Sequence, residues 1–191
     1  MYSLPQPAQH HEAPAIAELI MLAMNHDCCQ WFAGEQHSLD DFRIMLIELI
    51  EHEHSQYSYR NTIVVRTECG NVAGILVSYN GDDLLALRRT FIDAAQRHLQ
   101  RDFSLMDAET QGGELYLDSL AVHPEHRCQG IATTLLRAGI ERARQLHLPA
   151  VGLLVDAGNP GAEKLYKRIG FRHVDDTSWG GHPMHHLQFA L

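Results

Sequence analysis

The segment Ala121-Val122-His123-Pro124-Glu125-His126-Arg127-Cys128-Gln129-Gly130-Ile131-Ala132 predicts the end of a strand, a loop, and a helix that starts near Gln129. A loop entering a helix presents unpaired backbone N–H groups and the positive end of the helix dipole, which together favour an anion. Gly130 would let a phosphate approach the backbone, and Arg127 adds positive charge. The alternative is a turn glycine beside a solvated helix face, because neither G-x-x-x-x-G-K-[ST] nor G-x-G-x-x-G occurs.

The elements around this segment alternate between strand and helix. Upstream, residues 115–122 form a predicted strand, and downstream, apolar spacing predicts a helix over residues 131–146, closed by Pro149. The remaining predicted elements are a buried strand at 151–155, a short helix at 162–169 ended by Gly170, and two strands at 171–174 and 186–190.

The N-terminal half adds further elements of both kinds. Val- and Ile-rich residues 62–66 and 72–79 flank a Cys69-Gly70-Asn71 turn, which predicts a β-hairpin. The other predicted elements are a short strand at 2–4 and helices at 12–24, at 38–50 after a Ser38 capping box, and at 84–99. The fold class is therefore α/β, with a mixed central sheet of about six to seven strands flanked by helices.

Composition restricts the classes of function. A length of 191 residues with 45% hydrophobic content predicts a single domain, 1–191. The net charge of -9 argues against a nucleic-acid partner. The longest early apolar run, residues 19–24, is too short to cross a membrane, and the first fourteen residues do not resemble a signal peptide. With four scattered cysteines, we expect a cytoplasmic protein with reduced thiols.

Two blocks in this order resemble the GNAT superfamily of acetyl-CoA-dependent N-acetyltransferases. Residues 127–132 match its R/Q-x-x-G-x-G/A signature and follow a matching strand, Leu117–Val122, and His123-Pro124. Asn159, Ala162, Leu165-Tyr166 and Gly170-Phe171 match the family pattern N-x-x-A-x-x-L-Y-x-x-x-G-F. The resemblance covers about 60 residues, from 114 to 173, whereas the first 80 residues match only in the order of their elements.

The resemblance implies a GNAT-like sheet that splays between strands four and five, with the thioester of acetyl-CoA in the gap. N–H groups of residues 129–133 and the Arg127 loop would hold the pyrophosphate, the strand edge at 120–122 would pair with the pantetheine arm, and Asn159 would contact that arm. The expected cofactor-binding residues are Leu120, Ala121, Val122, Arg127, Cys128, Gln129, Gly130, Ile131, Ala132, Thr133, Asn159, Ala162 and Tyr166. Cys128 replaces a common glycine and would be strained if its φ is positive.

Acetyl transfer to an amine requires a neutral amine, a donor for the oxyanion and an acid for the sulfur. Tyr166 suits the acid because a phenol is protonated at neutral pH, and backbone N–H near Val122 can serve the oxyanion. The candidates for the base are Glu114, Asp118, or a water held by either one. Alternation places Glu114, Tyr116 and Asp118 on one face of the strand unless a bulge intervenes.

Three functions remain open at this point. The first is an N-acetyltransferase that acts on a small-molecule or peptide amine, and the second is a catalytically silent acyl-CoA sensor or scaffold. The third, a histidine-based metal module, is disfavoured because the 14 histidines lack H-E-x-x-H or paired C/H spacing, so we expect no metal. Residues 127–144 contain four Arg and one Glu and form a local cationic patch, so the rest of the chain has a net charge of -12. This negative charge favours a cationic acceptor. A homodimer is compatible with the sequence.

Overall fold

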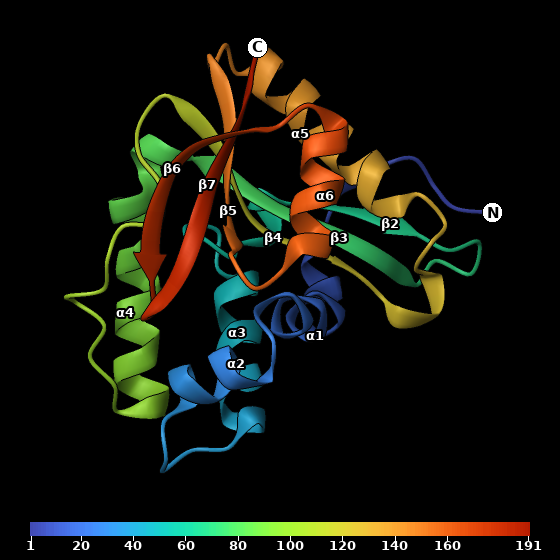
Figure 1. Cartoon of the computed structure of the whole chain (residues 1–191). Helices are drawn as coiled ribbons and strands as arrows, with labels where there is room; N and C mark the ends of the chain where they lie inside the picture. The colour runs from blue at the N-terminus through green and yellow to red at the C-terminus, as the bar shows by residue number, and fades with distance from the viewer.

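The computed structural model describes residues 1–191 and contains one seven-stranded sheet, ordered β1-β2-β3-β4-β5-β7-β6 (Figure 1). Neighbouring strands are antiparallel except for β4 and β5, which pair in parallel. This is the mixed sheet that the sequence predicts. The strands are β1 (Gln6–Pro7), β2 (Thr62–Arg66), β3 (Val72–Asn80), β4 (Glu114–Val122), β5 (Ala150–Asp156), β6 (Arg172–Trp179) and β7 (His182–Ala190).

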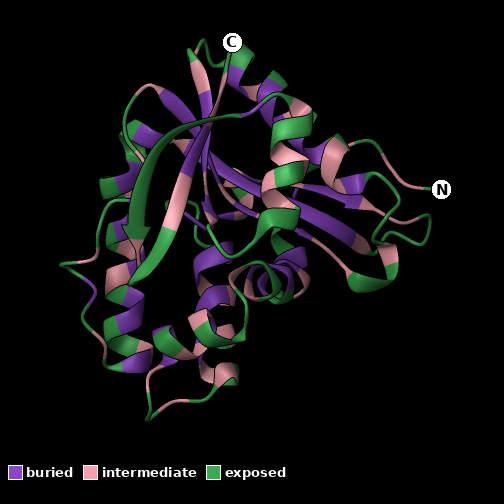
Figure 2. Cartoon of the chain, viewed as in Figure 1, coloured by how far each residue is buried: buried purple, intermediate pink, exposed green.

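Helices cover both faces of the sheet, and each face has its own apolar core (Figures 1 and 2). Helices α1 to α4 pack on one face around Phe32, Phe42 and Phe91, whereas α5 and α6 pack on the other, against residues such as Leu76 and Leu117. None of the helices has both the length and the apolar character needed to cross a membrane. The helices are α1 (Ala13–Met24), α2 (His26–Ala33), α3 (Leu39–Glu51), α4 (Leu84–Leu99), α5 (Ile131–Gln145) and α6 (Pro160–Ile169), with short 3₁₀ turns η1 (His10–Glu12), η2 (Tyr59–Asn61), η3 (Gly81–Asp83) and η4 (Pro124–His126).

Three local predictions differ from the structure. The expected strand at 2–4 is absent, because β1 supplies the pairing with β2 and Tyr2 forms only an isolated bridge with Thr67. Helix α2 was not predicted, and it is started by the Asn25 side chain, which accepts a hydrogen bond from the Cys28 N–H at 3.0 Å. Strands β6 and β7 are longer than predicted. The prediction was too short because much of their sequence is polar and solvent-exposed and lacks an apolar pattern, as Figure 2 shows for the exposure of β6.

Strand β4 contains the bulge that the sequence analysis left open. Val77 lies opposite Ser119 and the next residue of β3 lies opposite Leu117, so Asp118 is the extra residue. Leu117 packs with the core under α5, whereas Ala121 packs with the core under α1 to α4. The bulge therefore changes which face of the sheet the side chains of β4 occupy: residues four apart on either side of it point to opposite faces instead of the same one.

The sheet opens between β4 and β5. These strands pair over only three positions, from Glu114 opposite Ala150 to Tyr116 opposite Gly152. Beyond Tyr116, β4 stays paired with β3 and β5 stays paired with β7. The backbone groups of residues 117–122 that point towards β5 therefore have no strand partner, which confirms the predicted splay.

Candidate active site

The loop before α5 forms a row of unpaired backbone donors. No N–H group from Cys128 to Thr133 has an acceptor within the protein, and the first helical hydrogen bond of this turn runs from the Thr134 N–H to the Gly130 carbonyl oxygen at 3.0 Å. Cys128 and Gly130 both have left-handed backbones, with φ of +61° and +81°. Six consecutive donors at a helix N-terminus can bind an anion such as a phosphate.

Cys128 carries the backbone strain that the sequence analysis anticipated. A left-handed conformation costs a residue with a Cβ about 1–2 kcal/mol, and the exposed side chain of Cys128 makes no hydrogen bond that offsets this cost. The conformation nevertheless leaves the N–H row intact. The structure therefore has cysteine at a position where glycine would be unstrained.

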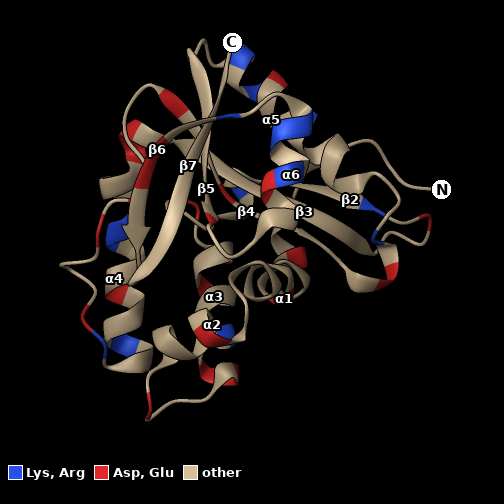
Figure 3. Ribbon diagram, viewed as in Figure 1, with Lys and Arg blue, Asp and Glu red and all other residues tan.

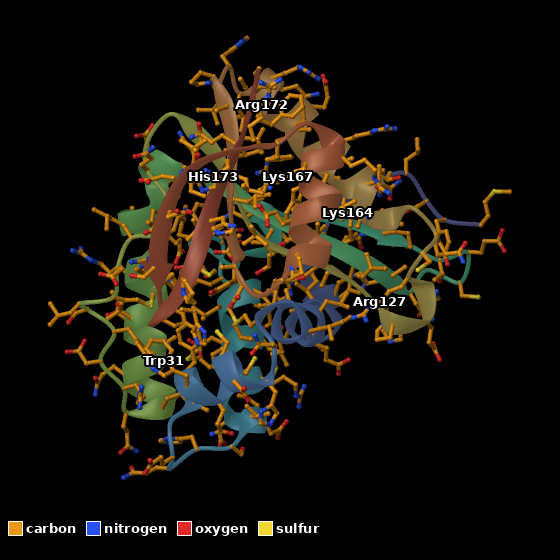
Figure 4. The ribbon with its side chains drawn as sticks, in the orientation of Figure 1. Trp31, Arg127, Lys164, Lys167, Arg172 and His173 are labelled. Atoms are coloured by element: carbon orange, nitrogen blue, oxygen red, sulfur yellow. The ribbon has the colours of Figure 1, made fainter.

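A cleft of about 740 Å³ extends from this loop along the open edge of β4. Arg127 and Arg168 line it. Figure 4 shows Arg127 in the loop below α6, and Figure 3 shows Lys and Arg side chains on that helix. Arg142, by contrast, donates to the Asn61 carbonyl oxygen and Ser78 Oγ and is partly buried, so it does not belong to the predicted cationic patch. The cleft is lined by Leu22, Ala23, Leu120, Ala121, Val122, His126, Arg127, Cys128, Gly130, Ile131, Ala132, Thr133, Asn159, Gly161, Ala162, Leu165, Tyr166 and Arg168.

A second cavity, of about 560 Å³, adjoins the cleft where β4 and β5 separate. Three carboxylate residues line it, Glu109, Asp118 and Asp156, whereas no Lys or Arg does. The two spaces share Ala23, Leu120, Asn159, Ala162 and Tyr166. The other residues around the cavity are Met24, Asn25, Cys28, Tyr57, Tyr116, Ser119, Leu154, Val155, Gly158, Trp179, His182 and Met184.

Tyr166 lies at the junction of the two spaces. It is half-buried on α6, its ring packs against Phe171 at 6.0 Å, and its hydroxyl makes no hydrogen bond within the protein. Burial raises the pKa of Tyr166 to about 12, so the phenol stays protonated at neutral pH. Asn159 begins α6, and its Oδ1 accepts the Ala162 N–H at 3.1 Å, which leaves its side-chain amide N–H group free.

Asp118 is one of the three carboxyls that line the acidic cavity. Ser119 Oγ donates to its Oδ1 at 2.8 Å, and Tyr79 Oη lies 3.1 Å from its Oδ2. Burial and, next, the negative charge of Glu109 raise the pKa of Asp118 to about 7. A carboxyl with this proton affinity can accept a proton near neutral pH.

Glu114 lies outside the cavity lining, unlike the other predicted base. Its side chain is fully enclosed, and it accepts hydrogen bonds from Thr110 Oγ1 at 2.6 Å and Gln188 Nε2 at 2.7 Å, with His186 Nε2 at 3.0 Å. Burial opposes its ionisation, but these hydrogen bonds hold its pKa below the usual range. Glu114 is thus a buried charge that joins β4 to β7, and we do not propose it as the base.

Tertiary contacts supply site residues that the sequence analysis missed. Glu109 comes from the segment between α4 and β4, Tyr57 from the segment before η2, and Arg168 from the exposed side of α6. None of these residues belongs to a recognisable motif. Among the C-terminal histidines only His182 lines the cavity, and the structure contains no group of three metal-ligating side chains.

Comparison with known proteins agrees with this geometry. The family model for the acetyltransferase (GNAT) family matches residues 22–171. A mycothiol acetyltransferase of Pseudarthrobacter chlorophenolicus is 41% identical over 69 residues, which are 36% of this chain and 21% of that protein. The chain therefore spans about a fifth of this curated relative.

Two solved structures are similar over nearly the whole chain. One, described as an acetyltransferase, has a TM-score of 0.80 and 30% identity, covering 98% of this chain and 99% of the other. An N-acetyltransferase from Staphylococcus aureus has a TM-score of 0.84 at 23% identity, covering 98% and 100%, and shows the shared fold. From the family match and these likenesses, the chain belongs to the acetyltransferase (GNAT) family.

Proposed function

We propose that this protein transfers the acetyl group of acetyl-CoA to a cationic primary amine. The observation that carries the proposal is the junction at Tyr166, where a cleft lined by unpaired N–H groups meets a cavity lined by carboxylates. One space suits an anionic cosubstrate and the other suits a cation. The two meet where the sheet opens.

The residues of the cleft fit acetyl-CoA. The N–H groups of 128–133, with Arg127 and Arg168 beside them, would bind the pyrophosphate. The unpaired edge of β4 at 120–122 would pair with the amides of the pantetheine arm, as an added strand pairs with a sheet edge. The free amide N–H group of Asn159 would donate to the same arm.

Bound acetyl-CoA supplies an activated acetyl thioester, and the side chains at the junction move the protons. Asp118 accepts the proton of the incoming ammonium group, directly or through a water, so that a neutral amine can attack. Backbone N–H groups of the open β4 edge near Val122 donate to the carbonyl oxygen as negative charge develops there. The nitrogen loses its second proton to solvent as the amide forms. Tyr166 Oη donates a proton to the departing sulfur and regains one from solvent.

The charge of the cavity supports a cationic acceptor. Glu109, Asp118 and Asp156 line it without any Lys or Arg. Arg88, which is paired with Glu109, offsets one of these charges, and Asp156 and the ionised form of Asp118 supply the remaining negative charge. A concave site with one sign of charge raises the local concentration of the opposite ion. We therefore expect amines with a positive charge in addition to the reacting one to be preferred.

Acetylation of an amine panel tests the proposal. Purified protein is incubated with acetyl-CoA and amino acids, polyamines, aminoglycosides and lysine peptides, and acetylated products are identified by mass spectrometry. We expect acetylation of one cationic class, reduced in Asp118→Asn and unchanged in Asp93→Asn, which removes an exposed carboxyl on α4 outside the cavity lining. Binding of CoA without acetylation of any amine would instead establish a silent acyl-CoA-binding domain.

A further inference from the structure

A second carboxyl, Glu109, lies close to Asp118 and takes no part in the proton transfers described above. Its side chain is 4% exposed and lies 2.9 Å from Arg88 Nη2 on α4, which is equally buried. Burial raises the pKa of Glu109, against the opposing effect of Arg88. A buried carboxyl this close to the proposed base affects the proton affinity of that base.

Two side chains bridge the carboxyls of Glu109 and Asp118. Tyr79 Oη lies 2.8 Å from Glu109 Oε1 and 3.1 Å from Asp118 Oδ2. Gln56 Nε2 lies 3.3 Å and 3.5 Å from the same two oxygens. The amide has two hydrogens and can donate to both carboxyls, whereas the phenol has one hydrogen and can donate to only one of them.

The bridging hydroxyl therefore indicates how many protons the pair holds. If both carboxyls were ionised, one of the two short contacts of Tyr79 Oη would join a lone pair to a lone pair. A proton on one carboxyl removes this conflict, because that carboxyl then donates to Tyr79 Oη while Tyr79 donates to the other carboxylate. The geometry fits a pair with one bound proton and one negative charge.

The surrounding charges determine which carboxyl holds the proton. Arg88 contacts Glu109 and favours its ionised form, so the proton belongs mainly to Asp118. No other cation offsets the charge at Asp118. The titratable groups that interact with Asp118 are Glu109 and, through it, Arg88, together with Tyr57, Tyr79, Tyr116 and Cys28. Asp156, Tyr166 and His182 line the same cavity.

We propose that Glu109 is a positioning residue, whose Arg88-held charge and Tyr79 bridge strengthen the hold of Asp118 on a proton, so that Asp118 loses its own proton only near neutral pH and, once ionised, takes the acceptor's proton. The inference rests on the proposed function for the role of Asp118 as base. Without Glu109, Asp118 would be an ordinary carboxylate and a weaker base. The two carboxyls would titrate as a coupled pair, so their apparent pKa values belong to the pair.

The pH dependence of kcat/KM in Glu109→Gln tests the proposal. Loss of the Glu109 charge makes Asp118 easier to ionise, and Arg88, left unpaired, acts in the same direction. We expect the acidic limb to move down by about one pH unit or more and the plateau rate to fall. Glu109→Asp, which keeps the charge, should leave the limb in place.

Glu12→Gln is the matched control, because Glu12 forms another buried pair with an arginine, 2.7 Å from Arg66 Nε and outside the cavity. This variant should lower the stability of the protein without moving the acidic limb of the kcat/KM profile. If Glu109→Gln lowers kcat/KM equally at every pH, Glu109 is only structural and the inference fails. If the wild-type protein acetylates no amine, the proposed function fails instead.

Carbon-13 NMR of side-chain carboxyls in the wild-type protein gives a second readout that does not depend on the folding of Glu109→Gln. The resonance of Asp118, assigned with Asp118→Asn, should titrate near pH 7, and that of Glu109 should respond over the same pH range. An Asp118 carboxyl that titrates near its ordinary value of about 3.9, without a response from Glu109, would overturn the inference.

Discussion

Tyr166 and Asp118 both line the cavity where β4 and β5 separate, and burial raises the pKa of each side chain. At the scale of single residues, we propose Tyr166 as the acid that protonates the leaving sulfur. Tyr166→Phe removes one hydroxyl and keeps the ring against Phe171, so the fold should persist. We expect kcat to fall roughly 10- to 1000-fold with nearly unchanged binding of CoA. Tyr59→Phe, outside both cavities, is the control, and a wild-type kcat in Tyr166→Phe would contradict the assignment.

The raised pKa of Asp118 also affects stability. Because the folded protein binds this proton more tightly than the unfolded chain does, the free energy of unfolding falls as pH rises from about 4 to about 7. Asp118→Asn lacks this loss, so its stability relative to wild type should increase across that range. Denaturation at both ends of the range measures the effect. Parallel curves for the two proteins would show that the carboxyl titrates normally.

At the scale of elements, the sequence predicts most of the cleft that we propose holds the cosubstrate. The loop at 127–132 and the two helices α5 and α6 are local patterns. The structure has the loop and the start of α5 where the sequence predicts them, whereas α6 begins two residues earlier than predicted, at Pro160. The prediction of the β6–β7 hairpin was incomplete because its residues are mostly exposed and polar. Gly180-Gly181, with φ of +59° and +81°, is nevertheless a hairpin turn signal. Exposed strands lack the apolar alternation on which strand prediction depends.

The loop before α5 allows a matched test of cosubstrate binding. Gly130 and Gly70 have φ of +81° and +85°, and a Cβ at either position would meet no atom within 4 Å. Valine should therefore cause similar backbone strain, about 1–2 kcal/mol, at both sites. We expect both variants to melt earlier than wild type, but only Gly130→Val to lose the rise in Tm that millimolar CoA causes. Loss of that rise in Gly70→Val as well would contradict the placement of the cosubstrate.

At the scale of the whole molecule, charge is separated between the two spaces. Arginines line the cleft and carboxylates line the cavity, in a chain with a net charge of -9. Amines with zero, one or two additional positive charges should show successively lower KM. High salt should reduce the differences, because the Debye length falls from about 8 Å at physiological ionic strength to about 3 Å at 1 M. A preference for neutral acceptors that salt does not change would contradict the expected field.

The network behind the base could not be predicted from sequence. Gln56, Tyr79, Arg88 and Glu109 come from four segments and meet Asp118 only through tertiary packing, with 62 residues separating Gln56 from Asp118. Asp118 itself was identified as one of two candidates, since both carboxylates lie on the same strand. We propose Asp118 rather than Glu114 because the opening of the sheet begins after Tyr116 and the bulge falls at Asp118.

The most direct test of the account is the pH dependence of kcat/KM for the wild-type protein, measured with several amines of different pKa. If Asp118 takes the proton, the acidic limb should lie near pH 7 for every amine. A limb that follows the pKa of each free amine, with none near 7, would show that the amine loses its proton before it binds. That result would contradict the role of Asp118.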